Sequence, residues 1–92
     1  MKKGNKIKES EVAMVSAASA ALKILNKDET KTTEEIIQEV VSLVRAKTDA
    51  KIASISAANQ AIKIKRQNPE FGDREIIERA VKEAKSGLGI VE

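Results

Sequence analysis

The sequence predicts an all-α protein built from two copies of one helix–loop–helix unit, which together form a four-helix arrangement. Three observations support this prediction. Apolar residues recur at steps of three and four, the period of a helix with one buried side. The pattern of the first half returns 40 residues later. The chain has 92 residues, and this length suits a single domain.

The repeat needs no gap between residues 12 and 41. Identical pairs include Ser16/Ser56, Ala17/Ala57, Ala18/Ala58, Ala21/Ala61, Lys23/Lys63, Ile24/Ile64, Glu35/Glu75, Ile36/Ile76, Ile37/Ile77 and Val41/Val81. Two unrelated helices rarely stay in register through a loop, so we interpret the match as a duplication. Two copies are fewer than the three repeats that a solenoid needs. We therefore expect a closed bundle with pseudo-two-fold symmetry, or a dimer of hairpins.

The first unit is assigned to residues 9–48, after a basic flexible tail at 1–8. A helix from about Glu9 to Asn26 is expected, followed by a polar loop at 26–31. Thr32 and Glu35 have the spacing of a capping box and should begin a second helix. The apolar stripe of the first helix is Val12, Val15, Ala18, Leu22 and Leu25. That of the second helix is Ile36, Ile37, Val40, Val41 and Val44.

The second unit, residues 49–87, follows the same plan and is followed by a C-terminal tail at 88–92. Asn68 and Pro69 end its first helix, because the residue before proline avoids the helical region. Asp73 is expected as the N-cap of the last helix, and Phe71 is expected to cover the end of the core. The stripes are Ile52, Ile55, Ala58, Ile62 and Lys65 in one helix, and Ile76, Ile77, Ala80, Val81 and Ala84 in the next.

The junction between the units, residues 45–51, contains no glycine or proline. Two alternatives stay open. The chain turns there and Thr48 or Asp49 begins a new helix, or one helix runs from about 33 to 67. A continuous helix of that length cannot fold back on itself, so it would favour an intertwined dimer. The turn is the favoured alternative.

The composition excludes several classes of site. The chain has no Cys and no His, which removes thiolate chemistry, zinc fingers and histidine-based triads. Glu35 and Glu39 lie four apart but have no histidine beside them, so we expect no metal. With no catalytic or phosphate-binding pattern, we expect a protein that is not an enzyme and uses neither a cofactor nor a small-molecule substrate.

The start of the chain imitates a secretory signal, because lysines precede the apolar run from Val12 to Leu22. The Ser-Ala-Ala pattern of this run recurs at 56–58, where no signal peptide occurs, so we interpret the run as a buried helix. No apolar stretch reaches the length of a membrane span. We therefore expect a cytoplasmic protein that does not contact membranes.

The leading functional hypothesis is an interaction module that binds a protein partner and forms a homodimer. Small residues in the first helix of each unit, together with the apolar C-terminal tail, are its candidate surface. The residues are Ala17, Ala21, Ala57, Ala61, Leu88 and Ile90. Tight packing inside the bundle is the alternative interpretation of the alanines and is the favoured one.

The second hypothesis is an accessory protein that binds nucleic acid with its basic residues. These are Lys2, Lys3, Lys6 and Lys8 in the tail, and the cluster Lys63, Lys65 and Arg66. The net charge is +3, but removing the four tail lysines from 17 basic residues leaves 13 against 14 acidic ones. Cations at the C-terminal end of a helix also complement its dipole. The absence of Trp and Tyr argues against stacking on single strands.

Overall fold

The computed structural model describes residues 3–44 and 48–87, with side chains described for 11–44 and 50–86. Four helices follow in order: α1 (Lys3–Lys27), α2 (Thr33–Leu43), α3 (Thr48–Gln67) and α4 (Asp73–Gly87). The described ranges contain no strand. The predicted all-α fold with four helices is therefore confirmed at this level.

Two helix starts differ from the sequence-based prediction. α1 begins at Lys3, so residues 3–8, expected as a tail, have helical backbone. Three of these six residues are lysines, which are good helix formers. Asp73 is the first residue of α4 rather than its N-cap. Gly72 precedes it, and the Gly72 carbonyl accepts a hydrogen bond from the Ile76 N–H at 3.0 Å.

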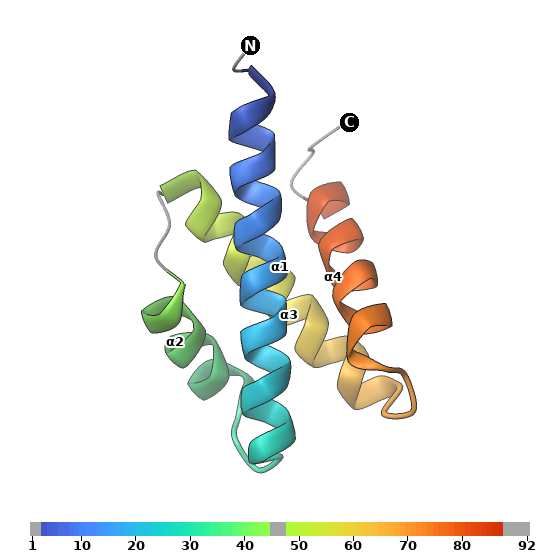
Figure 1. Cartoon of the computed structure of the whole chain (residues 1–92). Helices are drawn as coiled ribbons and strands as arrows, with labels where there is room; N and C mark the ends of the chain where they lie inside the picture. Colours follow the sequence, from blue (N-terminus) through green and yellow to red (C-terminus); the bar gives the residue numbers. More distant parts are fainter. Residues whose placement is uncertain (1–2, 45–47, 88–92) are drawn as a thin grey trace.

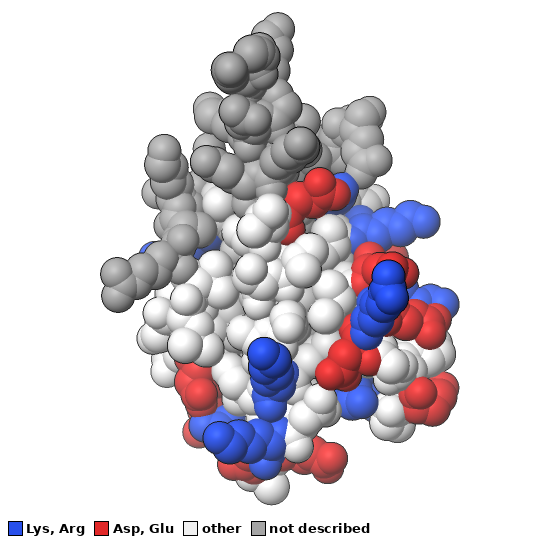
Figure 2. Space-filling model, viewed as in Figure 1, with Lys and Arg blue, Asp and Glu red and all other residues white. Residues whose placement is uncertain are grey.

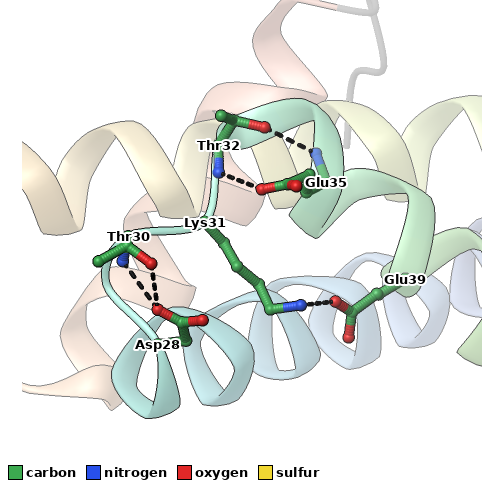
Figure 3. Close-up of polar contacts among 6 residues, drawn as sticks. All are labelled: Asp28, Thr30, Lys31, Thr32, Glu35 and Glu39. Carbon is green, nitrogen blue, oxygen red and sulfur yellow. Dashed lines mark hydrogen bonds and ion pairs between the residues drawn. The ribbon is translucent and has the colours of Figure 1, made fainter.

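The start of α2 has the predicted capping box (Figure 3). The Thr32 hydroxyl accepts a hydrogen bond from the Glu35 N–H at 3.2 Å, and the Glu35 carboxylate accepts one from the Thr32 N–H at 2.9 Å. Both N–H groups would otherwise lack an intrahelical partner. The local sequence therefore fixes where this helix begins.

The two long helices form the centre of the molecule, and the two short helices flank them (Figure 1). α3 passes behind α1 in this view, and the α1–α3 pair is the most extensive helix contact. α2 lies on one side of the pair and α4 on the other, each in contact with both central helices. Within the described helices, α2 and α4 do not touch.

Alanines dominate the contact between α1 and α3. Six of them have no exposed surface: Ala17, Ala18, Ala21, Ala57, Ala58 and Ala61. Small side chains let the two helices approach closely, and larger residues fill the two sides. Ile36 and Val40 pack on the α2 side, and Leu22 and Ile76 pack on the α4 side. Ile36 and Ile76 are both 0% exposed, as the sequence predicted.

The apolar stripes predicted for the first helix of each unit are partly wrong. Val12 is 65% exposed, Val15 is 44% exposed and Ile52 is 53% exposed. The buried side is turned toward the alanines instead, with Met14 only 1% exposed. Close packing of α1 on α3 selects the side with the smallest residues, which leaves the branched residues at the surface.

The junction is described up to Val44 and again from Thr48. α2 ends at Leu43, and Val44 has extended backbone with φ −97° and ψ 107°. A single helix from 33 to 67 is therefore not formed, because the chain leaves the helical conformation at Val44. Residues 45–47, on which the predicted turn falls, lie outside the described residues.

The two loops have the same backbone hydrogen bonds at positions 40 residues apart. In the first loop, the Asp28 N–H donates to the Ile24 carbonyl, the Lys31 N–H to the Asp28 carbonyl and the Ile36 N–H to the Thr32 carbonyl. In the second loop, the Asn68 N–H donates to the Ile64 carbonyl, the Phe71 N–H to the Asn68 carbonyl and the Ile76 N–H to the Gly72 carbonyl. Contacts between the units correspond as well. Asn26 donates to Asp73 at 3.4 Å, and Arg66, its counterpart 40 residues later, donates to Thr33 at 3.1 Å.

Candidate functional site

An uncharged surface runs along the outer side of α1. Residues 12–22 contain no charged side chain, so about three turns of the helix are neutral on every side. The inner side packs on α3. We call the outer side the α1 face: Val12, Val15, Ser16, Ser19 and Ala20, which are exposed or half-buried. Figure 2 shows a broad uncharged area in the middle of this side of the molecule, with charged side chains around its edge.

The two ends of the α1 face are bounded by charged residues of opposite sign. Glu11 precedes it and Lys23 follows it. Glu11 forms an ion pair with Lys85, which links α1 to α4. The Glu11 side chain is still 43% exposed. Lys23 is exposed to solvent. The α1 face therefore has an acidic end and a basic end.

The corresponding surface of α3 differs at its ends. Residues 52–62 also contain no charged side chain. The α3 face consists of Ile52, Ile55, Ser56, Asn59 and Gln60, all exposed or half-buried. Lys51 precedes it and Lys63 follows it, and both are exposed. Both ends of the α3 face are therefore basic.

Beside the α1 face, a shallow groove of about 410 Å³ runs between α1 and α4. Val15, Ile77 and Val81 supply its apolar lining, and the charged residues Glu11, Glu78, Lys82 and Lys85 also line it. Val15 thus belongs both to this groove and to the α1 face. The apolar part of the α1 face therefore continues into a groove that also carries charged side chains.

A wider and more open groove, of about 1190 Å³, lies between α3 and α4. The single aromatic residue, Phe71, is half-buried there and packs on the core at the end of the bundle, as the sequence predicted. Arg79 lies 4.9 Å from the centre of the Phe71 ring and donates hydrogen bonds to Glu75 at 2.9 and 3.1 Å. Lysines, arginines and glutamates alternate along this groove, so its charge favours no single class of ligand.

The alanines predicted to bind a partner are buried inside the chain. Ala17, Ala21, Ala57 and Ala61 are each 0% exposed and contact neighbouring helices of the same molecule. This burial favours the alternative interpretation of tight packing inside the bundle, because no partner reaches these residues without separating α1 from α3. Leu88 and Ile90, the other two predicted residues, lie outside the described residues.

The basic cluster predicted for nucleic acid lies at the C-terminal end of α3. Arg66 donates hydrogen bonds to the Lys31 carbonyl at 2.7 Å and to the Thr33 hydroxyl, so it ties α3 to the start of α2. Lys65 donates to the Pro69 carbonyl at 3.4 Å, and Lys63 lines the groove between α3 and α4. Two of the three cations therefore bind the chain itself. Lys2 lies outside the described residues, and for Lys3, Lys6 and Lys8 only the helical backbone is described.

Two groups in the first loop have shifted pKa values (Figure 3). Hydrogen bonds from the Thr30 hydroxyl at 2.5 Å and the Thr30 N–H at 3.0 Å hold the pKa of Asp28 below its ordinary value. The hydrogen bond to Glu39 raises the pKa of Lys31 above its ordinary value. Both groups are at the surface, where they order the loop rather than form a reactive site.

Among the side chains that the structure describes, no three or more acidic residues gather as they would around a metal ion. Ser54 is the buried polar residue of this part of the chain, and its hydroxyl donates to the Ala50 carbonyl at 2.7 Å. None of the described helices is long and apolar enough to cross a bilayer. No protein-family model, curated protein or solved structure has significant similarity to this chain.

Proposed function

We propose that this chain is a non-enzymatic interaction module that binds a protein partner through the uncharged outer side of α1. The observation that carries the proposal is the α1 face. It exposes Val12 and Val15 on a helix with no charged residue for eleven positions. The proposed contact residues are thus the exposed valines Val12 and Val15, in place of the buried alanines.

A partner that covers the α1 face removes apolar area from water. Burial of apolar area stabilises a complex by roughly 25 cal/mol per Å². Single exposed apolar residues are common on any protein surface. Here two valines stand beside small uncharged residues, and Val15 continues into the groove lined by Ile77 and Val81. A partner helix that packs on residues 12–22 of the α1 face buries the two valines without removing a charge from water.

We also propose that the two units descend from one duplicated helical hairpin. The identical residues 40 positions apart, the paired loop hydrogen bonds and the paired contacts from Asn26 and Arg66 support this origin. The duplication accounts for the second uncharged surface on α3. Because the charges at the ends of the two faces differ, the two surfaces need not bind the same partner.

Site-specific photocrosslinking in the cells that produce this protein tests the proposal. A benzophenone-bearing amino acid replaces Val15, and a matched variant carries it in place of Gln38, which is exposed on α2. We expect discrete crosslinked protein products from position 15 and none from position 38. Equal yields from both positions, or no product from position 15, would refute the proposal.

A further inference from the structure

We infer that the partner of the α1 face is a second copy of this chain, bound so that the two α1 helices run antiparallel about a two-fold axis. This inference rests on the proposed function, because it names the partner of the same surface. It follows from the charges at the ends of the α1 face, from the small residues at its centre, and from the contrast with the α3 face.

The charges of the α1 face are complementary to those of a second, antiparallel α1 face. Glu11 and Lys23 are twelve residues apart, or about 18 Å along the helix. We place the two-fold axis midway between Ser16 and Ser19. Glu11 of each copy then lies almost opposite Lys23 of the other copy, with an offset of about 1.5 Å along the helix axis. The interface then contains two opposite-charge pairs. A parallel pair would instead place like charges together.

Glu11 is already held at the edge of the face by Lys85 of α4. Its carboxylate has two oxygens, and Oε2 accepts the Lys85 contact. The side chain is 43% exposed, so a cation from a second copy reaches it. The intrachain ion pair therefore holds the Glu11 carboxylate at the α4 edge of the face, where part of it stays open to solvent.

The centre of the face suits close approach of two helices. Ser16 and Ser19 are small and lie nearest the axis, and Val15 and Ala20 follow at equal distances from it. In the antiparallel pair, Val15 packs on Ala20 of the other copy. Val12 packs on the aliphatic stem of Lys23 of the other copy. Uncharged serines thus meet at the centre of the interface, and the valines meet small or aliphatic groups on both sides of it.

The α3 face does not form the equivalent pair, although its centre is similar. Antiparallel pairing of two α3 faces would place Lys51 of one copy beside Lys63 of the other, at both ends of the interface. An α1–α3 pair would have one attractive end and one repulsive end. The arrangement with two attractive ends is the α1–α1 pair, which closes as a two-fold dimer and does not polymerise.

The test measures dimerisation of the full chain by sedimentation equilibrium over a series of concentrations. Lys23→Glu and Glu11→Lys should each weaken the dimer at least about tenfold, because one substitution affects both ends of a two-fold interface. An equimolar mixture of the two variants should dimerise again. Lys63→Glu, at the position 40 residues later, is the matched control and should leave the dimer unchanged.

A second pair of variants avoids any disturbance of the Glu11–Lys85 ion pair. Val12→Lys should abolish the dimer, whereas Ile52→Lys, at the matching exposed position of α3, should not. Thermal melts followed by circular dichroism confirm that each variant is folded. A wild-type chain that is monomeric at every concentration, or equal effects of Val12→Lys and Ile52→Lys, would overturn the inference.

The outcomes for the inference and for the proposed function are distinguishable. Crosslinks from position 15 to a different protein, with a monomeric purified chain, overturn the dimer and leave the proposed function standing. Absence of any crosslinked product together with a monomeric chain overturns both. A crosslinked product of twice the chain mass, absent in Lys23→Glu, supports both.

Discussion

Truncation of Ile36 to alanine tests whether the core is shared between the two units. Ile36 lies on α2, is 0% exposed and packs in one cluster with residues of α1 and α3, among them Leu25 and Ile62. The substitution removes three carbon groups from the place where three helices meet. It changes no residue of the α1 face.

The expected cost follows from this burial. Three buried carbon groups correspond to about 2.4 kcal/mol at roughly 0.8 kcal/mol each. The cavity left by partial relaxation raises the cost into the range of about 2–5 kcal/mol that is usual for such truncations. A 92-residue domain has a total stability of about 5–14 kcal/mol. Ile36→Ala should therefore lower the melting temperature by at least about 10 °C.

Urea denaturation followed by far-UV circular dichroism is the suitable assay, because the chain has no Trp or Tyr for intrinsic fluorescence. Ile76→Ala is the matched variant in the second unit, where Ile76 is also 0% exposed and packs between α1, α3 and α4. Its cost should agree with that of Ile36→Ala within about 1 kcal/mol. Leu43→Ala, at a residue that is 65% exposed, is the control and should cost about 0.5 kcal/mol or less.

Two results would refute the reasoning. If Ile36→Ala costs no more than Leu43→Ala, the packing of α2 on the central pair is incorrect. If one of the two isoleucine variants unfolds in a separate transition while the rest of the chain stays folded, the units do not share one cooperative core.

Further predictions concern the central interface and the first loop. Ala57→Leu adds volume between α1 and α3, so it should cost about 1–3 kcal/mol in the same urea assay, and an unchanged midpoint would contradict the tight packing. Thr32→Ala removes the helix cap and should cost about 1 kcal/mol, also measured from the urea midpoint. The pKa of Asp28 lies below its ordinary 3.8 because Thr30 donates to the carboxylate. Its contribution to stability should therefore be present above pH 3.8 and be lost as the pH falls further, and Asp28→Asn should remove that dependence from urea midpoints measured across acid pH. The pKa of Lys31 lies above its ordinary 10.5 because of its ion pair with Glu39. The contribution of Lys31 to stability should therefore be present below pH 10.5 and be lost as the pH rises further. Lys31→Met should remove this dependence from urea midpoints measured across alkaline pH.

The parts of the fold that depend on neighbouring residues could be predicted from the sequence. The Thr32–Glu35 capping box formed as predicted, since both partners lie within one turn. Ile36 and Ile76 were correctly placed in the core, because charged and polar residues around α2 and α4 leave a single apolar side. Asp73 was misplaced by one position, because an acidic residue is favourable both at the cap and in the first turn.

The orientation of the long helices could not be predicted in the same way. In α1 and α3 the central three turns contain no charge, so hydrophobicity varies little around the helix and gives a weak signal of which side is buried. The larger residues Val12, Val15 and Ile52 were therefore assigned to the core, whereas the structure buries alanines. The candidate site was missed for the same reason. The available signal was the pair of charges, Glu11 and Lys23, that bounds the neutral run.

The sequence by itself determined that this protein is helical, where the loops between α1 and α2 and between α3 and α4 lie, where α2 begins and which sides of the two short helices are buried, because these depend on contacts within a few residues. Only the tertiary structure decided which side of each long helix faces inward. Two central helices pack most closely through their smallest side chains, and this contact joins residues about 40 positions apart. The same choice placed Val12 and Val15 on the surface and so created the α1 face.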